Sequence, residues 1–438
     1  MPGFRSVLIS LGLLGAAGAA SASVCADRSA EILAALREGD YAAATTHFDA
    51  RVKAAVDAQR LEQVWAQALP LKFGAFDHAD AGTESAQGET ALVETSLHFA
   101  HGPLVMRVAC DARGQVTGLR FAPAAAPPEA GPRAVNERRL DVPSPLGPLP
   151  GTLTLPSGQG PFPAVVMVDG SGPHDGDETI GPNKPFRDIA QGLAAAGIAS
   201  LRYDKRTLVY GARIAARKDV TIDQEVTDDA LAAVKLLATQ PGVDPQRLFV
   251  LGHSLGGYMA PRIGQRDPRL AGLVLLAAPA RPLQEVSAQQ VREQGKLQGL
   301  TEAQVAQREQ AIDAERQLLA KADPAHPPAG AFGGAPQGYW LSLRDYDAVA
   351  VAKELAMPML VLQGGSDFQV SPSGDFARWQ AALAGRPQVA FHRYDGLNHL
   401  FMPAGKTGTP ADYQVPGHVD AQVIGDMAAW IKAQPARR

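Results

Sequence analysis

The segment Leu248–Tyr258 constrains this chain more than any other stretch of its sequence. It opens with a short run of apolar, β-forming residues and passes through Gly252-His-Ser-Leu-Gly256, which matches the pattern G-x-S-x-G, into residues typical of a helix. A strand that turns sharply into a helix needs residues without a bulky Cβ on both sides of the bend, and the two glycines of the pattern meet that need. Ser254 then lies at the tip of the turn with its hydroxyl exposed. The pattern therefore predicts a strand–turn–helix unit that presents a serine side chain.

Length and charge limit what the rest of the chain can be. With 438 residues, of which 46% are hydrophobic and 20% charged, the chain is long enough for two globular domains. Its formal net charge of -4 and the lack of a long basic run in the sequence argue against a nucleic-acid or anionic-membrane partner. The sequence offers no signal for an oligomeric state.

The first 22 residues have the organisation of a secretory signal peptide. A basic residue, Arg5, precedes an apolar run over residues 7–20, and Ala20 and Ala22 form an A-x-A cleavage site. We therefore expect cleavage after Ala22 and export of the mature protein to the periplasm of a bacterium or to the medium. The apolar run is short for a membrane span, so no stable span is expected after cleavage, and an uncleaved anchor is the alternative.

The two cysteines, Cys25 and Cys110, both lie in the N-terminal quarter of the chain. Since an exported chain enters an oxidising compartment, a disulfide between them is the simplest hypothesis, and two independent thiols are the alternative. Lipid attachment at Cys25 is disfavoured because Val24 precedes it, where lipoprotein signals have a small residue.

Residues 26–122 have the pattern of a small α+β unit. Helical periodicity in its first half gives way to alternation of apolar and polar residues in its second half. The helical segments are residues 29–36, 41–55 and 60–69, and the alternating segments are residues 89–100, 103–110 and 115–121. This sequence shows no cluster of acids, histidines and cysteines, so we interpret the unit as non-catalytic. A Pro/Ala-rich linker, residues 123–135, separates it from a second unit over residues 136–438.

Short apolar strands alternate with helices throughout the second unit, which is typical of a parallel sheet covered on both faces. The strands are expected at residues 164–168, 199–203, 248–251, 270–276, 359–362 and 389–394. Residues 281–356 interrupt this alternation with long polar helices and a Pro/Gly-rich loop. We interpret the insertion as a lid over the site, since long excursions of this kind tend to be functional, and a surface decoration is the alternative.

The serine has two candidate partners, each on a loop that follows a predicted strand. A serine hydroxyl is a weak nucleophile until a base removes its proton, and that base must be oriented by an acid. Asp367 ends the Gly-rich turn after the strand at residues 359–362, and His399 follows the strand at residues 389–394. The order Ser, Asp, His is that of the α/β-hydrolase triad. We therefore predict a triad of Ser254, Asp367 and His399.

Other acids and histidines fit these roles less well. Asp345 and Asp347 lie before a strand and would need a different topology. His253 belongs to the turn itself and should point away from the neighbouring serine, while His392 lies within a strand. Asp395 is the alternative acid, although its place four residues before the predicted base favours a turn-forming role.

Acyl transfer also needs hydrogen-bond donors for the oxyanion that develops on the substrate. The backbone N–H of Leu255, the residue after the nucleophile, is one candidate. The loop Val168-Asp-Gly-Ser-Gly-Pro173 should supply the second, for which we select the N–H of Ser171, with Gly172 next and a plain Gly-rich turn as the alternative. The sequence shows no metal-ligand spacing, phosphate loop or dinucleotide motif, so we expect neither a metal nor another cofactor.

Six stretches of the second unit together resemble one known family. They are Asp169–Pro173, Leu201–Arg206, Gly252–Gly256, Tyr339–Leu341, Gln363–Asp367 and Leu397–Phe401. They are similar to motifs of the bacterial EstD-like esterase group, whose members are described as esterases, serine-aminopeptidase-like or dienelactone-hydrolase-like proteins. The resemblance implies an α/β-hydrolase fold with a mostly parallel sheet and a helical lid, and a cofactor-free enzyme for carboxylic esters with modest acyl chains. The family's nucleophile, acid and base fall on Ser254, Asp367 and His399.

The first unit resembles the small nuclear-transport-factor-like domain that often precedes such hydrolases. Two positions depart from the pattern of many hydrolases: Asp169 stands where a histidine is common, and Thr207 follows Arg206 where a glycine is common. Both positions affect the expected pocket, so the acyl and alcohol groups of the substrate stay open.

Together these features predict an exported serine hydrolase that cleaves small-molecule carboxylic esters through an acyl-enzyme. A serine aminopeptidase or a thioesterase on the same triad is the first alternative, and Asp345, Asp347 or Glu315 could then bind a substrate amine. A non-catalytic envelope binding protein on a hydrolase scaffold is the second alternative.

Overall fold

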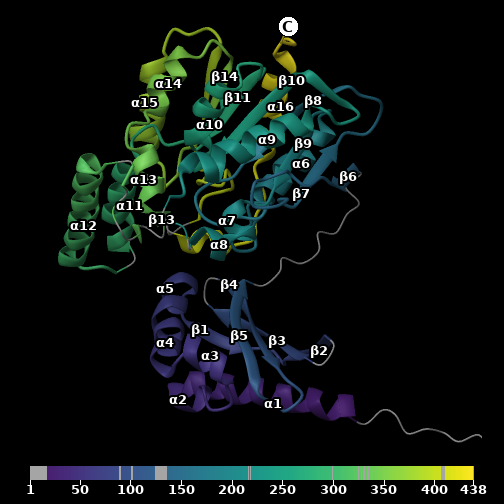
Figure 1. Ribbon diagram of the computed structural model, residues 1–438, viewed down its shortest axis with the longest axis vertical. Coiled ribbons are helices and arrows are strands. Elements are labelled where there is room, and N and C mark those ends of the chain that lie inside the picture. Colours follow the sequence, from purple (N-terminus) through teal and green to yellow (C-terminus); the bar gives the residue numbers. More distant parts are fainter. Residues whose placement is uncertain are drawn as a thin grey trace, which may run out of the picture. The chain divides into compact units, whose positions relative to one another are not determined.

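The computed structural model describes residues 17–87, 90–99, 102–123, 136–215, 217, 219–297, 299–323, 325–326, 328, 331–332, 335–405 and 410–437. The chain forms two compact units, Met1–Ala125 and Ala126–Arg438, which Figure 1 shows and which are described in turn. Residues 1–16 of the predicted signal peptide and residues 124–135 of the predicted linker lie outside the described residues. Within the described residues, no helix combines the length and the apolar character that crossing a membrane requires.

The N-terminal unit packs one long helix and several short ones against an antiparallel five-stranded sheet (Figure 1). In this sheet β1, β3, β4 and β5 are neighbours in that order, and β2 also pairs with β3. The helical elements are α1 (Ala17–Glu38), α2 (Tyr41–Ala44), α3 (Ala50–Ala55), α4 (Ala58–Glu62), η1 (Gln63–Ala68) and α5 (Leu69–Phe73). The strands are β1 (Phe76–Ala79), β2 (Thr83–Gln87), β3 (Thr90–Phe99), β4 (Gly102–Cys110) and β5 (Val116–Pro123). The predicted α+β organisation of this unit is confirmed.

A disulfide and an aromatic cluster hold the N-terminal unit together. Cys25 of α1 is bonded to Cys110 of β4, as predicted, and both cysteines are fully buried. The rings of Trp65 and Phe99 pack at a centroid separation of 6.0 Å in the same core. One local prediction was wrong: the helix expected over residues 41–55 is two helices, because the Asp49 carboxylate accepts a hydrogen bond from the N–H of Val52 and begins α3 anew.

The second unit is built on an eight-stranded, mostly parallel sheet in the order β15-β14-β11-β10-β8-β9-β7-β6 (Figure 1). Neighbours from β15 to β9 run parallel, whereas β7 and β6 are added antiparallel at one edge. The strands are β6 (Asn136–Arg139), β7 (Gly151–Leu155), β8 (Phe162–Val168), β9 (Ala199–Tyr203), β10 (Val243–His253), β11 (Gly272–Leu276), β14 (Met359–Gly364) and β15 (Val389–Tyr394). This confirms the predicted fold class. The edge strand β6 escaped prediction because its four residues are all polar and exposed.

Alternate residues of the central strands face two separate cores, one on each face of the sheet. On β8, Val166 and Val168 pack with residues of α9 and α10, while Val165 and Met167 pack with residues of α6 and α16. The helices are α6 (Pro185–Ala195), α7 (Arg206–Val209), α8 (Gly211–Ala215), η2 (Asp223–Thr227), α9 (Asp228–Leu237), α10 (Leu255–Arg266), η3 (Pro372–Phe376), α15 (Ala377–Leu383), η4 (Pro410–Gln414) and α16 (Ala421–Ala433). Since both faces are covered, the loops at the carboxyl ends of the parallel strands are where a ligand can approach.

The insertion between β11 and β14 is largely helical (Figure 1). It contains α11 (Leu283–Leu297), α12 (Glu302–Lys321), β12 (Ala331–Phe332), β13 (Ala335–Pro336), α13 (Gln337–Leu343) and α14 (Ala348–Glu354). Val286 of α11, Ile312 of α12 and Trp340 of α13 line a cavity that also contains Ser254. The insertion thus supplies walls of that cavity, which supports the interpretation as a cover over the site.

Candidate active site

Ser254 lies in a sharp turn between β10 and α10. Its backbone has φ 50° and ψ -114°, a conformation that residues with a side chain rarely adopt, and its N–H donates to the Leu276 carbonyl at 2.9 Å. The glycines of the motif allow this turn: a Cβ on Gly252 would overlap the backbone of Gly256, and a Cβ on Gly256 would overlap the Val168 carbonyl. The structure therefore contains the strand–turn–helix unit predicted from the sequence, with Ser254 at its tip.

Asp367 and His399 meet at the carboxyl ends of neighbouring strands. Asp367 follows β14, His399 follows β15, and Nδ1 of the imidazole lies 2.7 Å from Oδ2 of the carboxylate. Because a carboxylate accepts, Nδ1 donates, and this leaves Nε2 of His399 to act as a base. Both side chains are buried, so water competes little for this hydrogen bond.

Hydrogen bonds from its own loop fix the Asp367 carboxylate. Its Oδ1 accepts from the backbone N–H groups of Gln369 at 2.8 Å and Val370 at 2.9 Å, and its Oδ2 also accepts from Nε2 of Gln363 at 2.8 Å. A Cβ on Gly364, at the end of β14, would overlap backbone carbonyls of the histidine loop. The Gly-rich turn seen in the sequence is therefore needed for the close approach of the two loops.

The alternative candidates for the acid and the base have other contacts. His392 is exposed on β15, and Asp395 is 87% exposed and pairs with a neighbouring arginine. Asp345 is 83% exposed, and Asp347 caps the N-terminus of α14. His253 is engaged on both ring nitrogens by groups other than the serine. Among the acids and histidines considered from the sequence as the acid and the base, the two that form a hydrogen bond with each other are Asp367 and His399.

A cavity of about 690 Å³ opens at Ser254, and both predicted oxyanion donors, Leu255 and Ser171, line it. Leu255 is the first residue of α10, so its N–H belongs to the group that a helix N-terminus leaves without an acceptor within the helix. In the loop that follows β8, the N–H of Gly170 already donates to the Glu178 carboxylate at 2.7 Å, so the N–H of Ser171 is the next donor along the chain. The assignment of both donors stays a prediction.

Several buried charged residues near Ser254 were missed by sequence reasoning. Lys205 donates from Nζ to the Gly170 carbonyl at 2.7 Å and pairs with Glu225 at 2.9 Å, and Glu178 pairs with His253 at 2.8 Å. Burial raises the pKa of Asp169 well above its usual range, and the nearby charge of Glu178 adds to the rise. Charged side chains are normally expected on the surface, and the signals for these were the positions of Asp169, Lys205 and His253 within family-like stretches.

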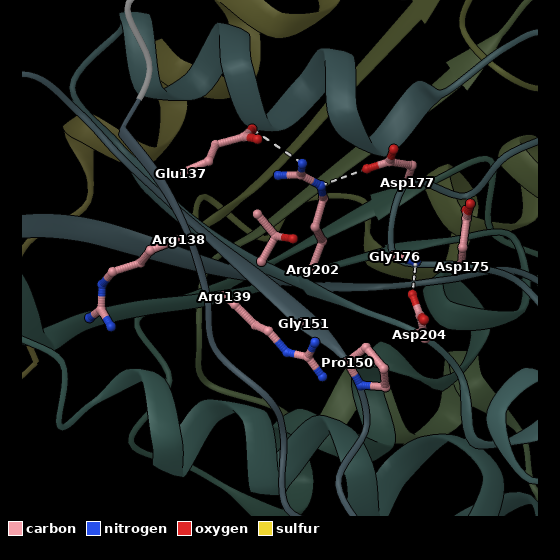
Figure 2. Close-up of a pocket in the computed structure, with 11 residues that line it drawn as sticks. Glu137, Arg138, Arg139, Pro150, Gly151, Asp175, Gly176, Asp177, Arg202 and Asp204 are labelled. Carbon is pink, nitrogen blue, oxygen red and sulfur yellow. Dashed lines mark hydrogen bonds and ion pairs between the residues drawn. The ribbon is translucent and has the colours of Figure 1, made fainter. Parts of the chain in front are cut away.

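A second cavity, of about 410 Å³, lies where the edge strands β6 and β7 meet the end of β9, and charged side chains line it (Figure 2). Arg202 of β9 is 5% exposed and donates to Asp177 at 2.8 Å, to Glu137 at 3.2 Å and to the Thr154 hydroxyl at 2.7 Å. The described residues that line this cavity do not include the triad. Arg202 pairs with Asp177 and Glu137 of the same cavity, and its bond to Asp177 anchors to the sheet the loop that contains Glu178.

His78, Asp80 and His98 form a cluster with the composition of a metal site in the N-terminal unit. His78 and His98 lie directly opposite each other on β1 and β3, and their rings stack at 4.2 Å with an interplanar angle of 5°. The lone pair of an imidazole nitrogen lies in the ring plane, so two parallel rings do not direct their lone pairs at one ion. We therefore assign no metal to this exposed cluster.

Comparisons with known proteins place the chain among hydrolases. Residues 183–403 match the family described as serine aminopeptidase, S33, and this range includes Ser254, Asp367 and His399. Over 386 residues the chain is 39% identical to esterase EstD of Thermotoga maritima, a match that covers 87% of this chain and 89% of that protein.

Two further matches are more limited. Thiohydrolase apmlB of Arthrinium phaeospermum is 33% identical over 122 residues, which is 27% of this chain and 35% of that protein. Among solved structures, Est1E from Butyrivibrio proteoclasticus is 15% identical with a TM-score of 0.44, over 68% of this chain and 99% of that one.

Proposed function

This chain belongs to the α/β-hydrolase family that includes esterase EstD and the serine aminopeptidase S33 hydrolases, and on that basis we propose that it is an exported serine esterase acting on neutral carboxylic esters. The observation that supports this most directly is the 2.7 Å contact of His399 Nδ1 with Asp367 Oδ2, in a sheet that also presents Ser254 in a strained turn. This contact leaves Nε2 of His399 available as a base, and the His399 carbonyl lies 3.0 Å from the ring of His253, the residue before Ser254. A base within reach of the serine hydroxyl is what acyl transfer by a serine requires.

The proposed mechanism follows from the positions of these groups. Nε2 of His399 takes the proton of the Ser254 hydroxyl as Oγ adds to the ester carbonyl, and Asp367 stabilises the imidazolium that forms. The N–H groups of Leu255 and Ser171 donate to the oxyanion of the tetrahedral intermediate. Collapse of the intermediate expels the alcohol, which receives the proton from His399 and leaves an acyl-enzyme. Water, deprotonated by the same imidazole, then releases the carboxylic acid and restores the serine.

The cavity favours a neutral substrate over an amine. Its walls are mostly apolar, and Glu225 is the acidic residue among the described residues that line it. The Glu225 carboxylate is compensated by Lys205 at 2.9 Å, so it offers no unpaired charge to a substrate ammonium group. Asp345, Asp347 and Glu315, the acids that an aminopeptidase was expected to use, are not among those described lining residues. An ester with an apolar acyl or alcohol group of moderate size therefore fits best.

Export is part of the proposal. Residues 1–22 have the organisation of a signal peptide, and the Cys25–Cys110 disulfide is a bond that persists in oxidising compartments. Fractionation of a bacterial host that expresses the full chain, with N-terminal sequencing of the product, tests this. A mature protein that begins at Ser23 in the periplasm or the medium is expected, and an unprocessed cytoplasmic protein would contradict it.

Substrate turnover and active-site labelling test the chemistry. We expect hydrolysis of p-nitrophenyl acetate and butyrate, slower turnover of aminoacyl arylamides, and covalent labelling by a fluorophosphonate. Ser254→Ala should abolish turnover and labelling, because no other hydroxyl occupies the tip of the turn. Labelling that persists in this variant would refute the assignment of the nucleophile. A series of thioesters should be included, since one partial relative is a thiohydrolase.

A further inference from the structure

A buried ion pair outside the triad connects three segments around Ser254. Oε1 of Glu178 lies 2.8 Å from Nδ1 of His253 and 2.7 Å from the N–H of Gly170. On the other side of the ring, Nε2 of His253 lies 3.0 Å from the carbonyl oxygen of His399. The Glu178 and His253 side chains are 1% and 5% exposed, so these contacts are made almost without water.

The protonation of His253 follows from its partners. A backbone carbonyl can only accept, so the Nε2 that faces the carbonyl of His399 donates a proton to it. Nδ1 faces an oxygen of Glu178 that already accepts from Gly170, so Nδ1 is a donor as well. With protons on both nitrogens, His253 is an imidazolium beside a carboxylate, and it has no lone pair with which to act as a base.

The pKa directions agree with this geometry. Burial by itself would lower the pKa of His253, but the charge of Glu178 and the hydrogen bond to it outweigh burial, so the pKa is raised. Burial would likewise raise the pKa of Glu178, but the charge of His253 outweighs it and the pKa is lowered. Both shifts favour the charged forms, in agreement with the hydrogen bonds that the two side chains make.

The fold holds Glu178 in place at a conformational cost. Glu178 has φ 52°, which is unfavourable for a residue with a side chain, and within the described structure its buried Oε2 has no hydrogen-bond partner. Neighbouring residues of its loop are anchored: Asp177 is bonded to Arg202, and the N–H of Gly176 is bonded to Asp204 at 2.8 Å (Figure 2). Strain that the surrounding structure maintains in this way is typical of functional sites.

We propose that Glu178 and His253 are positioning residues of the hydrolytic site, which together fix the oxyanion loop and the main chain of the catalytic histidine. Glu178 accepts from the N–H of Gly170 and Lys205 donates to its carbonyl, so the two peptide groups that flank Gly170 are both held. The Gly170 carbonyl shares its peptide plane with the N–H of Ser171, so the direction of that N–H is fixed as well. His253 holds the carbonyl of His399 from the strand that leads to the nucleophile. This inference rests on the proposed function.

Positioning of this kind should affect the rate more than the binding of substrate. The ground-state ester is held mainly by the apolar walls of the cavity, whereas the oxyanion and the imidazolium exist only as the reaction proceeds. A misplacement of about 1 Å in such groups can cost on the order of a hundredfold in rate. Losing the ion pair should therefore lower kcat and leave KM nearly unchanged.

The test compares Glu178→Gln, His253→Gln and the double variant in the full chain, with rates expressed per fluorophosphonate-reactive site. We expect kcat to fall by about tenfold to a hundredfold in each single variant, with KM within about threefold of the wild type. Because the two residues act as one unit, the double variant should lose little more than either single variant. Asp229→Asn is the matched control: it removes an equally buried carboxylate charge, paired with Arg206, and should leave kcat unchanged.

A tetrahedral inhibitor separates positioning from a purely structural role. 1-Butaneboronic acid adds to the Ser254 Oγ as the serine proton passes to His399, and the boronate anion occupies the place of the oxyanion. Its affinity should fall by the same factor as kcat in both single variants and stay unchanged in Asp229→Asn. Variants that keep kcat and boronate affinity within threefold of the wild type would overturn the proposal, as would a rise in KM at constant kcat. A wild-type protein without esterase turnover or labelling would instead refute the proposed function.

Discussion

Replacing the Asp367 carboxylate by an amide tests the triad most sharply, because the structure determines which way the amide must turn. Asp367 accepts four hydrogen bonds: from His399 and Gln363 at Oδ2, and from the backbone N–H groups of Gln369 and Val370 at Oδ1. In Asp367→Asn one of these two positions becomes an NH₂ group, which cannot accept.

The two orientations of the amide differ in cost. If NH₂ replaces Oδ1, two backbone donors lose their acceptor, at about 1–3 kcal/mol each. If NH₂ replaces Oδ2, the side-chain amide of Gln363 loses one acceptor and keeps the carbonyls of Gly364 and Val370. His399 adapts by moving its proton from Nδ1 to Nε2. The second orientation leaves fewer buried groups unpaired and should dominate. The imidazole then presents N–H to the serine instead of a lone pair, which is the tautomer that cannot act as a base.

The expected loss follows from that tautomer. Amide replacement of the triad acid in a serine protease lowers kcat by about 10⁴, and we expect a loss of about 10³–10⁴ in this variant. The free energy of unfolding should fall by only about 1 kcal/mol, because one buried hydrogen bond, from Gln363 to Oδ2, is lost. Stopped-flow or steady-state release of p-nitrophenol per folded molecule gives kcat, and thermal unfolding measured in parallel gives the change in stability.

The matched control is the same substitution at the alternative acid. Asp395 is 87% exposed and pairs with Arg393 at 3.0 Å, so Asp395→Asn should keep kcat within about threefold and stability nearly unchanged. An Asp367→Asn enzyme with more than a tenth of the wild-type kcat would refute this reasoning. So would a loss of activity in Asp395→Asn that exceeds the loss in Asp367→Asn.

Three further outcomes are expected. Replacing Cys25 and Cys110 by serine opens a loop of 85 residues and should lower the free energy of unfolding by about 2–5 kcal/mol, measured by denaturant titration, while leaving kcat per folded molecule unchanged. The Glu178–His253 ion pair should stabilise the fold most between about pH 4.5 and 6.5. Because folding lowers the pKa of Glu178, its contribution to stability is lost as pH falls below about 4.5 through the folded pKa. Because folding raises the pKa of His253, its contribution is fully present below about pH 6.5 and is lost as pH rises through the folded pKa. The stability difference between wild type and Glu178→Gln, measured from pH 4 to 9, should peak in that window, and a difference that grows steadily toward pH 9 would contradict the assigned charges. Trp340→Ala should widen the cavity and raise kcat/KM for octanoate relative to butyrate esters, and an unchanged ratio would show that this wall does not contact the acyl chain.

Sequence patterns predicted the parts of this protein that depend on residues close together in the chain. The turn at Ser254 needs glycine two positions before and two positions after it, and the overlaps that a Cβ would cause at Gly252 and Gly256 show why. The mostly parallel sheet was predictable from continuous apolar runs, because strands such as β8 are buried on both faces. Asp367 and His399 could be selected because each follows a strand of a parallel sheet, whose carboxyl ends lie at one edge.

Elements without such a local pattern were missed. The strand β6 consists of four polar, exposed residues, and it forms a strand only because it pairs antiparallel with the edge of β7. The helix expected over residues 41–55 is broken by a cap at Asp49, a side chain that is equally compatible with a helix interior or a helix start until its partner is known.

What only the tertiary structure decided is which polar groups share the interior with the serine. By itself the sequence predicted the nucleophile and its order with the acid and base, and it determined the sheet that presents them, since chain order and residue period are local properties. The pairing of Glu178 with His253 joins residues 75 positions apart, and the contact of His253 with His399 spans 146. No periodicity links residues at such separations, and a glutamate in a loop has the same local sequence whether it is solvated or buried. Burial and charge pairing depend on every segment that packs around a group, so the environment of Ser254 became known only with the fold.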